Sequence, residues 1–243
     1  MVGVDCATGT ILWKTPNPDG WKMSHSSVIP MTLNGRRAYV YGAEWGKMVA
    51  VSAERADAGE VLWTWGGLGK QVFVPSPLAL GEGRLFVTSL YGAGSAVIDA
   101  PALNAGREAK TVSLFEPGRS LASDLHTPIL HEGLLYGIQS GDAGATRNQF
   151  LCMNPADGGT IVWTSGKDRR FSPFGPFILA DGKFILLDAE GHLTLVKRSP
   201  SRYEELARFK LPEWRDSRSP MAIAGGRLLV RDDRRMVCLD LRD

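Results

Sequence analysis

A glycine and a tryptophan recur together along this chain at multiples of one interval, and this recurrence constrains the fold more than any other feature. The segment Gly9-Thr10-Ile11-Leu12-Trp13 recurs as Gly59 to Trp63 and again as Gly159 to Trp163. Weaker copies, in which an aromatic residue still closes the segment, occupy residues 109–115 and 204–209. Because self-similarity at a fixed period is typical of repeat architectures, we expect one supersecondary unit repeated along the chain.

A second series of motifs follows the same period and predicts β-hairpins. Two-residue turn signals lie between β-rich runs at Asn34-Gly35, Glu82-Gly83, Glu132-Gly133, Asp181-Gly182 and Gly225-Gly226. Glycine accepts the positive φ that tight hairpin turns require, so each signal predicts a turn between two antiparallel strands. A Ser-Pro or Thr-Pro step, or Ser26-Ser27, precedes each first strand.

Each unit therefore predicts four strands, named A to D from the inside outward, with the glycine turn between A and B and the tryptophan on D. About 50 residues with four strands match one blade of a β-propeller. The predicted fold class is an all-β propeller of four-stranded antiparallel blades in a single domain, 1–243. The blades are expected at 24–65, 74–116, 125–166, 171–211 and 217–243, with 1–15 as strands of a preceding or closing blade.

The quoted segments also resemble a known family. Residues 5–14 and 154–163 are similar to the tryptophan-docking motif of PQQ-like (pyrroloquinoline quinone-like) repeat proteins, in the quinoprotein alcohol dehydrogenase-like superfamily. Residues 179–183, 188–193 and 236–241 resemble the final blades of bacterial PQQ-binding-like propellers. The resemblance implies that a tryptophan on strand D and the glycine before it dock neighbouring blades. The expected blade-docking residues are Gly9, Trp13, Gly59, Trp63, Gly159 and Trp163.

The family usually has eight blades, whereas this chain has about five. Two explanations stay open. The chain could be the C-terminal portion, or fragment, of a longer eight-bladed protein. Alternatively, the strand from Thr10 to Lys14 could complete the last blade and close a five-bladed ring, which would remove exposed sheet edges.

A ligand site is expected at the mouth of the channel, where the D–A and B–C loops emerge on one face. The candidate ligand-binding residues are His25, Glu44, Trp45, Asp124, His126 and Asp142. His25 and His126 precede strand A in blades two apart. They could share a metal, a ligand or a proton. Alternatively, each histidine could hydrogen-bond the neighbouring loop at the entry to its blade.

The leading functional hypothesis is a non-catalytic binding or scaffold module with a protein, peptide or glycan partner at the channel face. No catalytic residue, metal or cofactor is expected. The alternative, implied by the resemblance, is a PQQ-dependent alcohol dehydrogenase-like enzyme lacking part of its site. PQQ with calcium is expected only under that alternative, because the chain has neither adjacent cysteines nor the family's calcium-ligand pattern.

Composition and charge narrow the partners further. The net charge is only +2 and no basic stripe occurs, so nucleic acid is not expected as a partner. No apolar run is long enough for a transmembrane helix, and no signal peptide is expected within the chain. The resemblance implies a bacterial periplasm or cell envelope. The cysteines, Cys6, Cys152 and Cys238, lie in apolar stretches and are each expected to be buried thiols.

Overall fold

The computed structural model describes residues 1–69, 72–102 and 107–242, and these form an almost purely β structure. The one helical element among them is a short 3₁₀ turn at Gly144–Thr146. The first sheet pairs β1 (Val2–Val4) with β2 (Ile11–Lys14). Blade 1 contains β3 (Ile29–Leu33), β4 (Arg36–Gly42), β5 (Lys47–Ser52) and β6 (Val61–Gly66).

Three more four-stranded blades and one three-stranded sheet follow in chain order. Blade 2 contains β7 (Leu78–Gly81), β8 (Arg84–Thr88), β9 (Ser95–Asp99) and β10 (Lys110–Phe115). Blade 3 contains β11 (Ile129–His131), β12 (Leu134–Ile138), β13 (Phe150–Asn154) and β14 (Thr160–Thr164). Blade 4 contains β15 (Phe177–Ala180), β16 (Lys183–Leu187), β17 (His192–Lys197) and β18 (Glu205–Lys210). The last sheet contains β19 (Ala222–Ala224), β20 (Arg227–Arg231) and β21 (Met236–Asp240).

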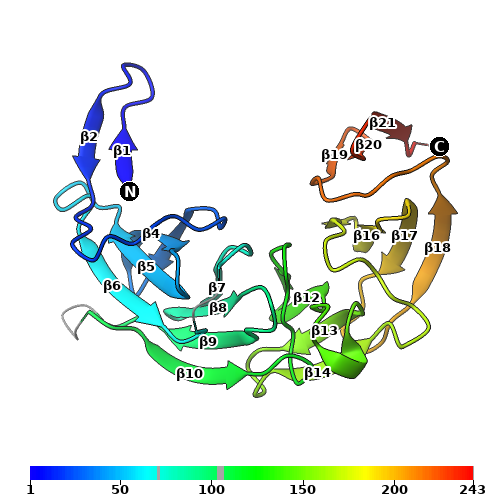
Figure 1. Cartoon of the computed structure of the whole chain (residues 1–243), viewed down its shortest axis with the longest axis horizontal. Helices are drawn as coiled ribbons and strands as arrows, with labels where there is room; N and C mark the ends of the chain where they lie inside the picture. Colours follow the sequence, from blue (N-terminus) through cyan, green and yellow to red (C-terminus); the bar gives the residue numbers. More distant parts are fainter. Residues whose placement is uncertain (70–71, 103–106, 243) are drawn as a thin grey trace.

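The sheets stand side by side along an arc, with β10, β14 and β18 on its outer edge (Figure 1). Every sheet is an antiparallel meander in which consecutive strands pair. This arrangement confirms the predicted fold class, a propeller of four-stranded antiparallel blades. The five predicted A–B turns are also confirmed, since both residues of each turn have positive φ, as at Asn34 (50°) and Gly35 (79°).

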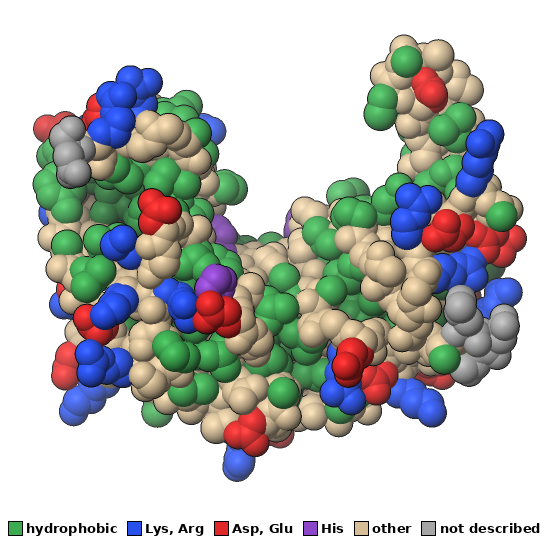
Figure 2. Space-filling model, turned by 180° about the vertical axis from the view of Figure 1, so that it is seen from behind, with side chains coloured by type: hydrophobic (Ala, Val, Ile, Leu, Met, Phe, Trp, Pro, Cys, Tyr) green, Lys and Arg blue, Asp and Glu red, His purple; other side chains and the backbone are tan. Residues whose placement is uncertain are grey.

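The arc is open. The two termini lie at its opposite ends (Figure 1), and the space-filling view shows a wide notch between two arms (Figure 2). In the described part of the chain, β2 pairs only with β1, and β21 pairs only with β20. The closed five-bladed ring considered from the sequence is therefore wrong for this structure, because the strand from Thr10 to Lys14 does not reach the last sheet.

All five pairs of C and D strands contain a β-bulge at the same place. One residue of strand D is left out of the one-to-one register in each pair: Leu12, Leu62, Val112, Val162 and Leu206. A bulge of this kind bends the strand and increases its twist. The bulge also aligns the weaker repeat copies with the strong ones, so that Ala109 and Tyr203 occupy the place of the motif glycine.

The hydrophobic core consists of layers between adjacent sheets. In four of the five D strands an aromatic residue (Trp13, Trp63, Phe115 or Trp163) packs on the following blade, beside the residue that lies three positions before the bulge of that blade. A Cβ atom at Gly59 would lie 2.7 Å from the ring of Trp13, and one at Gly159 would lie 2.7 Å from the ring of Phe115. Trp63 shares a buried cluster with Ala109, and the rings of Trp163 and Tyr203 have centroids 6.0 Å apart.

Burial of the cysteines differs from the expectation. Cys152 is buried, but Cys6 and Cys238 are exposed. The prediction was wrong for these two because Cys6 lies in the turn between β1 and β2, outside the strands, and Cys238 lies on β21 of the last sheet, which a neighbouring sheet covers on one side only (Figure 1). An apolar sequence context buries a thiol only where a second sheet packs against it.

Candidate functional site

Two B–C turns on adjacent blades present aromatic side chains to solvent. Trp45 has a φ of 62° and is 58% exposed, and Tyr91 has a φ of 55° and is 69% exposed. Each is followed by a glycine that also has positive φ, Gly46 and Gly92. This is the backbone of a two-residue hairpin turn in which the first position normally holds asparagine, aspartate or glycine. Both turns therefore hold a bulky residue in a backbone conformation that such residues rarely adopt.

Contacts with neighbouring loops hold the two turns in place. The backbone N–H of Glu44 donates to the carbonyl of Lys22, 3.1 Å away. A Cβ atom at Gly46 would meet the carbonyl oxygen of Gly69, so the turn lies against the D–A loop of its own blade. A Cβ atom at Gly92 would lie 3.4 Å from the Cβ of Asp142, which belongs to the next blade.

Of these residues, Glu44, Trp45 and Asp142 were predicted from the sequence, whereas Tyr91 was not in the candidate set. The signal that could have found it is an aromatic-glycine pair between strands B and C, which occurs in both blades.

Asp124 and Asp142 come together through the B–C loop of blade 3. The buried carboxylate of Asp124 accepts hydrogen bonds from Ser140 Oγ (2.8 Å) and from the backbone N–H of Gly141 (3.0 Å). Ser140 Oγ accepts in turn from the N–H of Asp142 (3.1 Å). Asp124 therefore fixes the loop, and the exposed Asp142 is the carboxylate that the loop presents.

His126 joins two blades. Its Nε2–H donates to the carbonyl of Phe174, 2.9 Å away in the loop that enters blade 4. Its ring lies edge-on to Phe177, with centroids 6.1 Å apart. Burial lowers the pKa of His126, although the hydrogen bond to Phe174 opposes that change. A neutral imidazole held this way matches the second sequence-based interpretation, a hydrogen bond to the neighbouring loop.

His25 is exposed, and its backbone N–H donates to the carbonyl of Phe73 (2.9 Å). No hydrogen bond, ion pair or ring contact among the described residues joins His25 to His126. The two histidines lie on different blades and do not form a compact pair.

A polar cluster that the sequence analysis missed lies on the B–C turn of blade 4. The buried carboxylate of Asp188 accepts from the backbone N–H groups of Glu190 (3.1 Å) and His192 (2.8 Å). His192 Nδ1 lies 3.0 Å from Asp188 Oδ2, and the Arg208 guanidinium donates to the same oxygen at 3.0 Å. The signal that could have found this cluster is the position of Asp188, directly after strand B of its repeat.

Asp188, Glu190 and His192 have ligand atoms close enough together to hold a metal ion. The arrangement does not fit the calcium that accompanies PQQ, because both carboxylate oxygens of Asp188 are already used. The Arg208 guanidinium also places a positive charge beside the carboxylate that would bind the cation.

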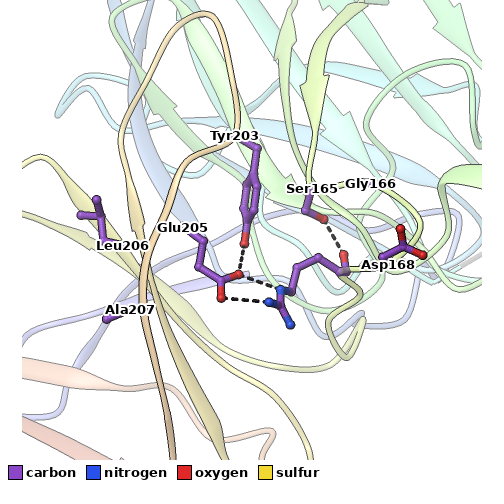
Figure 3. Close-up of a pocket in the computed structure, with 8 residues that line it drawn as sticks. Ser165, Gly166, Asp168, Tyr203, Glu205, Leu206 and Ala207 are labelled. Carbon is purple, nitrogen blue, oxygen red and sulfur yellow. Dashed lines mark hydrogen bonds and ion pairs between the residues drawn. The ribbon is translucent and has the colours of Figure 1, made fainter.

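A polar pocket of about 520 Å³ lies between blades 3 and 4 (Figure 3). The Arg169 guanidinium forms an ion pair with Glu205 (2.7 Å), and the Tyr203 hydroxyl donates to the same carboxylate (2.9 Å). Burial, together with the Glu205 carboxylate, raises the pKa of Tyr203. The pairing of Arg169 with Glu205 ties the D–A loop of blade 3 to strand D of blade 4, so the polar groups here stabilise a blade interface.

Comparison with known proteins supports the fold. No family model matches the chain, and no curated protein matches it. Among solved structures, BamB from Moraxella catarrhalis matches with a TM-score of 0.64 at 15% identity, over 98% of this chain and 62% of that one. A europium-containing methanol dehydrogenase matches with a TM-score of 0.54 at 14% identity, over 84% of this chain and 51% of that one.

These likenesses show a propeller fold of the kind present in both proteins. The chain spans about half to two thirds of the length of the structures that it matches. In the described part of the chain, no helix is long and apolar enough to cross a bilayer.

Proposed function

We propose that the chain is a non-catalytic binding or scaffold module that engages a protein partner through its loop face. The observation that carries this proposal is the pair of exposed aromatic residues, Trp45 and Tyr91, on equivalent turns of adjacent blades. A bulky residue at positive φ costs about 1–3 kcal/mol, and such strain clusters at functional sites. Tryptophan and tyrosine also dominate the energetics of protein interfaces.

The polar residues around these turns support binding rather than chemistry. Asp124 and His126 are engaged in hydrogen bonds that fix a loop and join two blades. Glu44, Asp142 and His25 remain at the surface, where they would form a polar rim around the aromatic side chains. A polar rim around aromatic anchors is the usual anatomy of a protein interface.

The comparisons support the same proposal at the level of fold, since BamB gives the highest TM-score of the structures described above. From the resemblance of the repeats, we infer that the chain is the C-terminal portion of a longer, eight-bladed propeller. The same resemblance supports a location in the bacterial periplasm or cell envelope.

Site-specific photo-cross-linking tests the proposal. A photoreactive amino acid at Tyr91 is expected to capture one polypeptide from an extract of the source cell. The same probe at Glu82 should not, because Glu82 also has positive φ but lies at the other end of β8. With the captured protein purified, Trp45→Ala/Tyr91→Ala should weaken binding by at least about tenfold. Equal capture from both positions, or unchanged affinity, would contradict the proposal.

The likeness to a methanol dehydrogenase raises the alternative of a quinoprotein dehydrogenase. A titration with PQQ and calcium, followed by absorbance and by dye-linked alcohol oxidation, separates the two functions. The binding proposal predicts no saturable uptake at micromolar PQQ. Saturable binding together with alcohol oxidation would overturn it.

A further inference from the structure

The A–B turns of blades 1 and 3 contact the following blade in the same way. Asn34, the first residue of its turn, donates from Nδ2 to the carbonyls of Ala100 and Pro101, each 3.1 Å away in the segment after β9. Glu132, at the same turn position, accepts two hydrogen bonds from the guanidinium of Arg198, which directly follows β17 (2.5 and 3.2 Å). We call this contact the turn latch. It joins the A–B turn of one blade to the residues after strand C of the next.

The turn latch is missing between blades 2 and 3. Glu82 holds the turn position of Asn34 and Glu132, with a φ of 50°. Its carboxylate forms no hydrogen bond or ion pair among the residues that the structure describes. A carboxylate only accepts hydrogen bonds, so it needs a donor on the facing blade. The residue that follows β13 there is Pro155, which offers neither a guanidinium nor a backbone N–H.

Pro155 also leaves a backbone acceptor unused. In blade 2, blade 4 and the last sheet, the residue after strand C donates its N–H to the carbonyl of the second turn glycine, as Ala100 does to Gly83 (2.9 Å). The equivalent acceptor in blade 3 is the carbonyl of Gly133. No backbone N–H donates to it in the described ranges of the chain, because Pro155 lacks the hydrogen.

A cavity of about 370 Å³ lies where these two acceptors are left over. Glu82 of blade 2 and Gly133 of blade 3 both line it. The apolar part of its wall comes from both blades and includes Leu80, Val97, Val112 and Leu130. Arg84 lines it too, but its guanidinium is already paired with the carboxylate of Asp99 (3.1 Å). The volume lies within the range of small-molecule sites.

We propose that this cavity binds a small alkylguanidinium compound, which supplies the donors that blade 3 lacks. The planar guanidinium has several N–H groups, so it reaches the Glu82 carboxylate and the Gly133 carbonyl together. Its alkyl part then lies against the apolar wall. The next blade interface provides the precedent, because there Arg198 places the same group on Glu132. The cavity lies at the A–B turns, at the opposite end of strand B from the B–C turns, and is independent of the function proposed for the loop face.

Titration of the isotope-labelled chain with n-butylguanidinium, followed by NMR, tests the proposal. The expected result is saturable chemical-shift changes at the amides of Gly133 and Ala156, which line the cavity. Glu82→Gln should weaken binding by at least about threefold, since it removes the charge that attracts the guanidinium. Glu60→Gln is the matched control, because Glu60 is an exposed carboxylate directly before β6 and should not affect binding. The absence of saturable changes, or equal effects of the two variants, would overturn the proposal.

Two further probes define what the cavity recognises. n-Butylurea has nearly the same shape but no charge, and it should bind at least about threefold more weakly than n-butylguanidinium. Equal binding of the two would mean that only the apolar wall is used, against the proposal. The peptide Gly-Gly-Arg-Gly-Gly separates a free compound from an arginine side chain of a partner protein. Tighter binding of the peptide than of n-butylguanidinium would assign the cavity to a protein partner and overturn the small-molecule proposal.

Pro155→Arg supplies the missing turn latch from within the chain. The new side chain takes the place that Arg198 has in the next interface, and its backbone N–H can donate to the carbonyl of Gly133. Binding of n-butylguanidinium should therefore be lost. Pro155→Ala restores only the N–H and should weaken binding less. Undiminished binding to folded Pro155→Arg would show that the ligand does not occupy this cavity, and would overturn the proposal.

Discussion

At the scale of single residues, the chain uses left-handed backbone for two purposes. At Gly59 and Gly159 the residue must lack a side chain, because an aromatic ring from the preceding sheet occupies that space. At Trp45 and Tyr91 the left-handed turn instead directs a large side chain to the exposed surface. The first purpose stabilises the fold, and the second costs stability and is explained by binding.

Alanine substitutions at Gly158 and Gly159 separate the cost of backbone strain at positive φ from the cost of displacing an aromatic ring. Both have positive φ, but only a Cβ at Gly159 would meet Phe115 and Ser120, each at 2.7 Å. Gly158→Ala should cost about 1 kcal/mol of unfolding free energy, from backbone strain alone. Gly159→Ala should cost about 1–3 kcal/mol more, because the ring must move. Urea denaturation measures both, and equal losses would show that the ring contact contributes nothing.

His126 should make stability depend on pH. Its pKa in the folded state is lowered from the ordinary value of 6.5, so the unfolded chain binds the proton more readily. The stability is fully present above pH 6.5 and is lost as the pH falls towards the folded-state pKa. His126→Gln keeps an N–H donor for the carbonyl of Phe174 and removes the titration. The loss of stability between pH 7 and pH 5 should be smaller in this variant, and an identical loss would exclude His126 as its source.

At the scale of elements, the D strands share one device for packing blades together, whereas the B–C turns differ from blade to blade. A bulge at one fixed place in every strand D turns the aromatic residues after it towards the next blade, which is why Phe115 can replace a tryptophan. The B–C turns use different devices. Blades 1 and 2 use an aromatic-glycine pair, whereas the buried carboxylate of Asp188 organises the turn in blade 4.

Asp188 should be a strong determinant of stability in blade 4. Asp188→Ala removes the acceptor of two backbone N–H groups and leaves the Arg208 guanidinium without its carboxylate. We expect a loss of about 2–3 kcal/mol, since Arg208 is partly exposed. Asp188→Asn keeps one acceptor oxygen and should lose roughly half as much. Thermal and urea unfolding measure the difference, and an unaffected Ala variant would refute this role.

At the scale of the whole molecule, stability comes from layers between sheets, so a sheet is only as stable as its neighbours allow. Blades 2 and 3 lie in the middle of the arc and are covered on both faces, whereas the first and last sheets are covered on one (Figure 1). Leu12 in the first sheet is 64% exposed, whereas Leu62, at the same bulge position in blade 1, is partly buried. The ends of the arc are therefore where opening should begin.

Hydrogen exchange should show this gradient directly. In dilute protein, amides of β2 should exchange much faster than those of β6, although both are D strands with the same bulge, because few buried apolar contacts oppose local opening at the end of the arc. Mass spectrometry of peptides covering residues 11–14 and 61–66 gives the comparison. Equal protection would mean that the arc opens as one unit.

The repeat, the hairpins and the strand order could be predicted because each depends on residues close together in the sequence. Asn34-Gly35 specifies a turn wherever it occurs between apolar runs. The candidate site was harder. Asp124 and Asp142 do lie together, but the bonds that occupy Asp124 come from Ser140 and Gly141, which only the folded loop brings to it.

By itself, the sequence determined that this is a β-propeller of four-stranded blades, because turn chemistry and the glycine-to-aromatic spacing act within each blade and between neighbours. Only the tertiary structure decided that the described residues form an open arc in which Phe209, at the place of Phe115, is exposed. It also decided that His126 bonds Phe174 rather than meeting His25. The physical reason is that the curvature of the arc sums small rotations at every blade interface, which no local pattern encodes.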